Sequence, residues 1–277
     1  MAPAAKRPRL VSPPENWRAT WDLIIELRKD RTAVVDAMGS EALADREADE
    51  ATFQYQTLIS LMLSSQTKDL VTAETMRALR KHGLTVDNIL DNTTDEELHE
   101  LIRKVGFHNN KTKYIRAATQ ILRDQHDSRV PDTMESLCAL PGVGPKMALI
   151  TLRVAHGITA GIAVDTHVHR IANQLGWTGG GTKNPEQTRA ALEAWVPFGL
   201  WARFNLELVG LGQEVQTEKP KLLAKSLLSS DPKTALRLLK TLGLDVHKVA
   251  AQHADDLDSK YGVADDLRLL VNKKKSS

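Results

Sequence analysis

The amino-acid sequence predicts an all-α protein built from two helical domains. Good helix formers dominate the 277 residues, and clusters of β-branched residues are few. Apolar residues recur at helical spacing in most segments of the chain. A glycine-rich turn at residues 140–146 joins two such segments, which is typical of a helix-hairpin-helix motif. The length suits one large domain or two modest domains with a hydrophobic core, and we expect two domains that flank a cleft.

Composition excludes several classes of protein. The formal net charge is +2 and the pI is near 8.6, which is compatible with DNA binding but does not require it. No apolar run reaches the ~20 residues of a membrane span, and the N-terminus lacks the apolar core of a secretory signal. We therefore expect no membrane association. The single cysteine, Cys138, excludes an intrachain disulfide and a multi-cysteine metal site.

Periodicity divides the chain into four parts. We expect a disordered basic tail at 1–14, a terminal helical domain from 15–46 plus 157–222, a helical domain with the hairpin at 47–156, and a helical C-terminal extension of unknown role at 223–277. The tail contains Lys-Arg-Pro-Arg at residues 6–9, which is either a nuclear localisation signal or a stray basic segment.

The first helices are predicted from apolar periodicity. Residues 15–29 form an amphipathic helix, in which Trp17 and Trp21 suit packing better than base stacking. Residues 51–63 form a strongly apolar helix, and residues 67–82 form the next one.

A polar break, Ser-Ser-Gln at residues 64–66, separates these two helices. Such a break is unusual for a simple connector. The break can be explained as an ordinary N-cap, with Ser65 or Thr67 capping the following helix. This structural role does not exclude a functional role for the same residues.

A capping box, with Thr94 as N-cap and Glu97 at the third helical position, predicts a helix that runs to Val105 and stops at Gly106. Residues 107–110 then form a loop. Phe107 is either a wedge that separates base steps or an aromatic side chain packed under its own loop.

Three cations and an aromatic residue follow at the start of the next helix. They are Lys111, Lys113, Tyr114 and Arg116. Cations interleaved with an aromatic side chain suit contact with nucleic-acid phosphates.

The hairpin turn has the residues that a phosphate site needs. Asp132 and Glu135 form a capping pattern that predicts the short helix before the turn. Gly142 and Gly144 can adopt positive φ, so the turn can close tightly and expose its backbone N–H groups. Pro145 suits the first position of the second helix. A helix N-terminus with exposed N–H groups binds phosphate readily.

Lys146 and Asp165 are the candidate reactive pair. Lys146 lies in the first turn of the second helix, where the helix dipole disfavours a cation by up to about 1 kcal/mol. Together with partial burial, this would favour a neutral, nucleophilic amine. Asp165 lies nineteen positions later, at the predicted N-cap of the helix that starts at Thr166. The alternatives are a surface lysine near DNA and a carboxylate that only caps a helix.

Downstream, His167 and His169 are two positions apart on a predicted helix, so they point in different directions and we expect no metal site. Helices are predicted at residues 185–195 and 200–211. Apolar stripes at 235–242 and 263–270 could pack on the core or dock a partner, and we favour the first.

Four stretches together resemble the endonuclease III family of DNA base-excision glycosylases. They are Leu-Met-Leu-Ser-Ser-Gln-Thr-Lys-Asp at 61–69, Val-Gly-Phe-His-Asn-Asn-Lys at 105–111, Leu-Pro-Gly-Val-Gly-Pro-Lys at 140–146 and Val-Asp-Thr-His-Val-His-Arg at 164–170. The resemblance runs from about residue 21 to residue 212. It is specific, because most branches of the helix-hairpin-helix superfamily lack a lysine at position 146.

The resemblance implies a bifunctional DNA glycosylase with abasic-site (AP) lyase activity, which excises oxidised pyrimidines in base excision repair. Lys146 would form a Schiff base that leads to β-elimination, and Asp165 would assist. The residues implied to contact DNA are Gln66, Phe107, Asn109, Lys111, Gly142, Val143, Gly144 and His167. The implied partner is double-stranded DNA with damaged bases or abasic sites, bound in the cleft by a monomer. We expect it in the nucleus, with the mitochondrion as a second location.

One segment departs from the family pattern. Many members follow their last helix with four cysteines that hold a [4Fe–4S] cluster. Here residues 213–220 read Gln-Glu-Val-Gln-Thr-Glu-Lys-Pro and contain no cysteine. Because such a cluster needs thiolate ligands, we expect neither a cluster nor another cofactor.

Three alternatives stay open. One is a glycosylase of the same superfamily that prefers another base, such as adenine or oxidised guanine. Another is a non-catalytic helix-hairpin-helix DNA-binding protein, which would need neither Lys146 nor Asp165. The last is a fold that has lost its activity together with its cluster.

Overall fold

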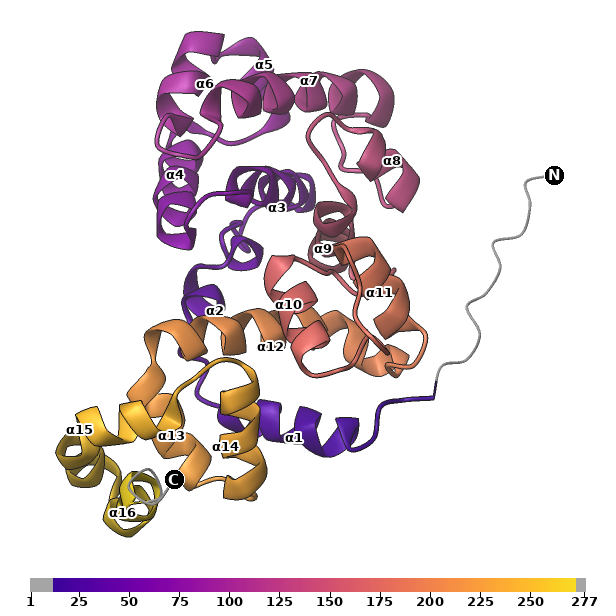
Figure 1. Cartoon of the computed structure of the whole chain (residues 1–277). Coiled ribbons are helices and arrows are strands. Elements are labelled where there is room, and N and C mark those ends of the chain that lie inside the picture. The colour runs from indigo at the N-terminus through magenta and orange to yellow at the C-terminus, as the bar shows by residue number, and fades with distance from the viewer. Residues whose placement is uncertain (1–11, 273–277) are drawn as a thin grey trace. The chain divides into compact units, whose positions relative to one another are not determined.

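The computed structural model describes residues 12–272, which form helices joined by short loops, with no strand in this part of the chain (Figure 1). The predicted all-α class is confirmed. The basic cluster at residues 6–9 and the lysines at 273–275 lie outside the described residues. Within the described range, none of the helices has the length and apolar character needed to cross a membrane.

The chain forms two compact units. The continuous unit is Val34–Ala163, and the discontinuous unit combines Met1–Ala33 with Val164–Ser277. The predicted boundaries, at 46/47 and 156/157, are therefore displaced. Side-chain contacts explain the first shift, because Ser60 Oγ donates to the Ser40 carbonyl (2.8 Å) and the backbone N–H of Asp45 donates to Gln56 Oε1 (2.8 Å). At the second boundary, Ala163 packs in an apolar cluster of the continuous unit.

The continuous unit contains nine helical elements among its described residues. They are α2 (Val34–Met38), η1 (Ser40–Ala42), α3 (Glu50–Ser64), α4 (Asp69–His82), α5 (Val86–Asp91), α6 (Asp95–Ile102), α7 (His108–His126), α8 (Met134–Ala139) and α9 (Pro145–His156). Helix α3 is buried along ten consecutive residues from Gln54 to Leu63 and packs against α4, α7 and α9. It forms the centre of this unit.

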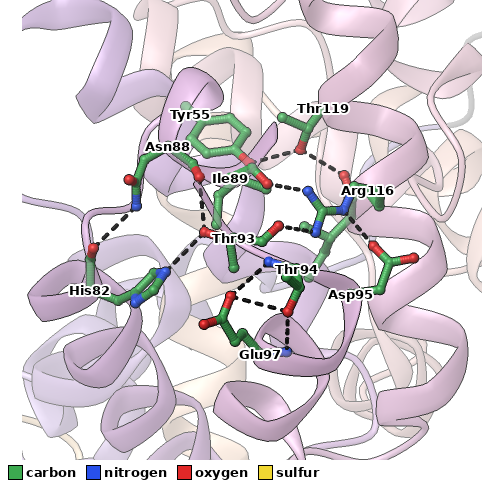
Figure 2. A network of polar contacts seen from close by, with 11 residues as sticks. Tyr55, His82, Asn88, Ile89, Thr93, Thr94, Asp95, Glu97, Arg116 and Thr119 are labelled. Atoms are coloured by element: carbon green, nitrogen blue, oxygen red, sulfur yellow. Dashed lines mark hydrogen bonds and ion pairs between the residues drawn. The ribbon is translucent and has the colours of Figure 1, made fainter. Parts of the chain in front are cut away.

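Arg116 joins α7 to α5, to the first residue of α6 and to the turn between these two helices (Figure 2). Its Nε donates to Asp95 Oδ1 at 2.8 Å, and its other nitrogens donate to the carbonyls of Ile89 and Thr93. The sequence suggested Arg116 as a phosphate-binding cation. The structure corrects this, because three acceptors within the continuous unit already hold the guanidinium.

Most helix ends follow the predicted capping chemistry. The capping box of Thr94 and Glu97 is present at α6, Pro145 opens α9, and Asp165 is the N-cap of α10. At α8 the cap is Thr133 rather than Asp132, because its hydroxyl accepts the N–H of Ser136 at 3.3 Å.

Helix α7 begins at His108 rather than at position 111, so the loop before it is shorter than predicted. Helix α6 ends at Ile102, before the predicted Val105.

The discontinuous unit contains eight helices among its described residues. They are α1 (Trp17–Leu27), α10 (Thr166–Gln174), α11 (Pro185–Glu193), α12 (Phe198–Thr217), α13 (Lys219–Leu227), α14 (Pro232–Thr241), α15 (Val246–Tyr261) and α16 (Ala264–Asn272). Trp21 stacks on Phe204 with ring centroids 4.9 Å apart, and Trp17 meets Trp195 edge-on at 5.1 Å. The packing role predicted for both tryptophans is confirmed.

The C-terminal extension belongs to the same unit as α1. Lys225 Nζ donates to the carbonyl of Leu27 at 3.0 Å and pairs with Asp30 at 3.0 Å. The backbone N–H of Ser230 donates to Glu26 Oε1 at 2.8 Å. Helices α13 and α14 therefore pack on α1. The favoured interpretation of the apolar stripes is confirmed for the stripe at 235–242, which lies mostly in α14, whereas the stripe at 263–270 packs against α15.

A buried ion cluster joins α12 to the segment after α1. Arg28 is fully buried; its Nη1 donates to Glu214 Oε1 at 2.9 Å, and its Nε lies 3.9 Å from Glu207 Oε2. Glu207 also forms an ion pair with Arg31, in which Arg31 Nη2 lies 2.5 Å from Glu207 Oε1. A Cβ at Gly210 would lie 2.0 Å from Arg28 Nη2, so only glycine leaves room for the guanidinium.

Candidate nucleic-acid interface and reactive residues

The hairpin turn is a tight β-turn between α8 and α9. The backbone N–H of Val143 donates to the Leu140 carbonyl at 3.1 Å, and Gly142 has a φ of 80°. Proline followed by a glycine with positive φ is the signature of a type II turn. A Cβ at Gly142 would also lie 2.9 Å from Tyr114 Cβ, so both conformation and space require glycine here.

The turn leaves two backbone donors for an anion. In the described part of the chain, the N–H groups of Gly142 and Gly144 make no hydrogen bond. The N–H of Val143 closes the turn, and its side chain is buried in the core of the continuous unit. Val143 was predicted to contact DNA together with the two glycines, and the structure corrects this because its donor is already used.

Lys146 and Asp165 both lie at helix N-termini. Lys146 is half-buried in the first turn of α9. Asp165 is half-buried at the N-cap of α10, where its Oδ1 accepts the N–H of Val168 at 2.9 Å. The cap predicted for Asp165 is confirmed. The chain passes from the continuous to the discontinuous unit between these two residues, after Ala163.

Gln66 and Phe107 lie on two loops that are in backbone contact. Both side chains are exposed, and both residues have left-handed backbones, with φ of 50° and 58°. A Cβ at Gly106 would lie 2.4 Å from the Gln66 carbonyl oxygen, and the Gly106 N–H donates to Thr67 Oγ1 at 3.1 Å. Left-handed residues other than glycine persist only where their surroundings hold them, and they gather at functional sites.

A pocket of about 180 Å³ brings three of the predicted segments together within the continuous unit. It is lined by Met62, Ser65, Gln66, Phe107, Asn110, Lys111, Tyr114 and Gly142. Asn110 and Tyr114 were not predicted to lie together at the site. Their spacing of four residues puts them on one face of α7, and this spacing could have identified them once the helix start was known.

Lys111 has a different role from the one predicted. It is 5% exposed, and its ammonium group donates to the carbonyls of Leu63 and Ser65 and to the hydroxyl of Thr67. Burial lowers the pKa of Lys111 to about 8. A phosphate contact is excluded in this arrangement, because three protein acceptors surround the amine.

Two of the remaining predicted contacts, Asn109 and His167, are not among the residues that line this pocket. Asn109 is exposed at the start of α7, and its Oδ1 is 2.8 Å from His99 Nε2. His167 is half-buried on α10, in the discontinuous unit, where a Cβ at Gly212 would lie 3.4 Å from its Nδ1. Asn109 belongs to the same unit as the pocket without lining it, whereas His167 belongs to the other unit.

The chain does not provide the ligands of an iron–sulfur cluster. Its one cysteine, Cys138, is exposed on α8, in the continuous unit. Residues 213–217, where the family places cysteines, form the last turn of α12. Four thiolates are needed and the sequence holds one, so a [4Fe–4S] cluster does not fit this chain.

Replacing Gly106 by alanine is expected to destabilise the protein by about 1–3 kcal/mol, because the new methyl group forces the two loops apart. Urea unfolding measures this change. Gly199→Ala is the matched control, since nothing lies within 4 Å of a Cβ there and alanine suits a helix better. Equal stability of the Gly106 variant and the wild type would show that the close contact with Gln66 does not constrain the loops.

Comparison with known proteins gives the family. The model of the "HhH-GPD superfamily base excision DNA repair protein" matches residues 59–198. "Endonuclease III-like protein 1" of Bos taurus is 52% identical over 201 residues, which cover 73% of this chain and 66% of the bovine protein. The protein of the same name from Gallus gallus is 50% identical over 201 residues, which cover 73% of this chain and 71% of the chicken protein.

The structural comparison agrees. The chain is similar to a solved structure described as a trapped endonuclease III–DNA covalent intermediate with an estranged adenine, with a TM-score of 0.58 and 26% identity. The match covers 69% of this chain and 84% of that one. With the hairpin, Lys146 and Asp165 in place, this chain belongs to the endonuclease III branch of the HhH-GPD superfamily of base excision DNA repair proteins.

Proposed function

We propose that this protein is a DNA glycosylase with AP lyase activity, which removes oxidised pyrimidines from duplex DNA in base excision repair. The observation that carries the proposal is that an amine and a carboxylate each stand at a helix N-terminus, with Lys146 in the first turn of α9 and Asp165 at the N-cap of α10. A DNA-binding module without catalysis would need neither residue. The similarity to an endonuclease III trapped as a covalent intermediate with DNA supports the same conclusion.

DNA binding begins at the hairpin. The N–H groups of Gly142 and Gly144 bind one backbone phosphate at the N-terminal end of α9, where the helix dipole favours an anion. Gln66 and Phe107 enter the duplex from the two touching loops. Phe107 is 61% exposed, so its ring is available to wedge between base steps. Extruding the damaged nucleotide costs a few kcal/mol, least for a base that already stacks poorly.

The reaction proceeds through Lys146. Its neutral amine attacks C1′ of the extruded nucleotide, the bond from C1′ to the base breaks, and the base leaves with the electron pair. Asp165, as a carboxylate, stabilises the cationic sugar and accepts a proton from the attacking amine. The sugar ring then opens to give a Schiff base between Lys146 and C1′. This makes the C2′ proton acidic, and β-elimination breaks the strand on the 3′ side.

The proposal includes the setting in which the enzyme works. The chain acts as a monomer on double-stranded DNA that contains damaged bases or abasic sites. It acts without a cofactor, since neither step above needs one. The Lys-Arg-Pro-Arg cluster at residues 6–9 supports a nuclear location. The mitochondrion is the second proposed location.

Borohydride trapping tests the proposal. Single-lesion duplexes carrying an oxidised pyrimidine, an oxidised guanine, an adenine mismatch or an abasic site are incubated with protein and borohydride. We expect a covalent protein–DNA adduct with the oxidised pyrimidine and the abasic site, together with strand cleavage that needs no heat or alkali. If strands were cleaved only after alkali treatment, the protein would lack the proposed lyase activity. If no duplex gave a covalent adduct, the proposal would be overturned.

Replacing Asp165 by asparagine isolates the role of the charge. Asparagine caps a helix about as well as aspartate, so α10 should keep its N-terminus and the melting temperature should not change. The excision rate is expected to fall by about 10²–10⁴-fold, because the variant can neither accept the proton nor stabilise the sugar cation. Single-turnover kinetics measure the rate. Wild-type kinetics in this variant would reduce Asp165 to a helix cap.

A further inference from the structure

The amine of Lys111 lies at the point where α3 ends and the Gln66 loop begins. Lys111 Nζ is 2.6 Å from the carbonyl oxygen of Leu63 and 2.7 Å from that of Ser65. The last carbonyls of a helix have no partner within it, and the helix dipole favours a cation at this end. The side chain therefore acts as a buried C-terminal cap that comes from another helix, α7.

Thr67 extends this contact to the second loop. Its hydroxyl donates to the Ser65 carbonyl at 3.2 Å and accepts from Lys111 Nζ at 3.1 Å. The same oxygen accepts the backbone N–H of Gly106 at 3.1 Å. One hydroxyl and one ammonium group thus join the loop that carries Gln66 to the residue directly before Phe107.

The conformation of Gln66 needs such support. Its φ of 50° is unfavourable for an L-residue, and its side chain is exposed, so its own contacts do not hold it. Burial works against a charged amine and lowers the pKa of Lys111 to about 8. The amine nevertheless donates to three acceptors, and they are the groups that shape the loop.

We propose that Lys111 is a positioning residue, which fixes Gln66 and Phe107 relative to each other so that both can enter the duplex, and that it does not itself bind DNA. The inference rests on the proposed function and adds the means by which the two loops are held. A misplacement of about 1 Å in such groups can reduce a rate by about 10²-fold. Loss of the amine should therefore affect the extrusion and excision of the base more than the initial binding of DNA.

Lys111→Met tests this, because methionine keeps most of the side-chain volume and removes every donor. Hydrogen exchange of the free protein comes first, and the amides of residues 64–67 should exchange at least about tenfold faster in the variant. Single-turnover excision at saturating enzyme should then slow by about 10–100-fold. Binding of an undamaged duplex should keep its affinity and its dependence on salt.

Two further variants make the result specific. Thr67→Val removes only the shared hydroxyl and should shift exchange and excision in the same direction, so it serves if the methionine variant does not fold. Lys225→Met is the matched control, because Lys225 also donates to a backbone carbonyl but lies in the discontinuous unit. It should lower stability without changing either the exchange of residues 64–67 or the excision rate.

Other outcomes overturn the inference. If Lys111→Met lowers the slope of log affinity against log salt by about 0.9 and leaves the saturated rate unchanged, Lys111 binds a phosphate. If exchange and excision both match the wild type, the contacts of the amine do not shape the loop. If the wild type excises no lesion, the proposed function fails, and hydrogen exchange still decides whether Lys111 holds the loop.

Discussion

Replacing Lys146 by glutamine is expected to abolish base excision, strand cleavage and borohydride trapping together. Glutamine is close to lysine in length but has no amine that can attack C1′ or form a Schiff base. Removal of the nucleophile should lower the single-turnover rate by a factor on the order of 10⁴ or more. Because Lys146 is only half-buried, the variant should fold. The rate is measured on an oxidised-pyrimidine duplex at saturating enzyme.

The control is DNA binding by the same variant. Gly142 and Gly144 provide the proposed phosphate contact, so the Lys146 variant should bind an abasic-site duplex with nearly wild-type affinity. Equal trapping of the variant and the wild type would show that another amine is the nucleophile. Loss of binding together with catalysis would point to Lys146 as a DNA contact.

Replacing Arg28 by methionine is expected to lower the free energy of unfolding by about 3–5 kcal/mol, because it leaves buried carboxylates without their central cation. Among the described side chains, Glu214 would keep only the hydroxyl of Thr32, whose Oγ1 is 3.0 Å from Glu214 Oε1. Glu207 would keep Arg31 and Arg203. For a protein of this size the loss corresponds to a fall in melting temperature on the order of 10 °C, which calorimetry can measure.

Arg18→Met is the matched control for this prediction. Arg18 also pairs with a carboxylate, Asp22, at 3.0 Å, but both side chains are more than half exposed. Exposed pairs contribute about 0–1 kcal/mol, so the melting temperature should hardly change. If Arg18→Met and Arg28→Met lowered the melting temperature equally, burial would not explain how much the Arg28 cluster contributes to stability.

Local chemistry made much of this fold predictable. Asp165, Thr94 and Pro145 mark helix starts through rules that involve only a few neighbouring residues, and the structure confirms all three. The tight turn at Gly142 follows from the same kind of rule. Contacts between Gly142 and Tyr114, which lie 28 positions apart, could not be predicted in this way.

Two cations show where such reasoning fails. Lys111 and Arg116 follow a glycine turn and stand beside an aromatic residue, which is typical of a phosphate-binding segment. Whether a cation faces solvent or a carbonyl depends on which helix end lies opposite. That information is carried by the ends of α3 and α5, which are 27 or more positions away. The spacing of residues within α7 does not show which helix end faces each cation.

The order of segments along the chain has a consequence for biosynthesis. The continuous unit is complete once residue 163 has been made, whereas α1 needs α12 to α14. The bonds from Lys225 to Leu27 and from Ser230 to Glu26 span 198 and 204 residues. At ribosomal speeds of about 5–20 residues per second, the apolar face of α1 waits roughly 10–40 s for its partners. During translation, the apolar face of α1 therefore stays without its partners while the continuous unit, with the loops that carry Gln66 and Phe107, can already fold.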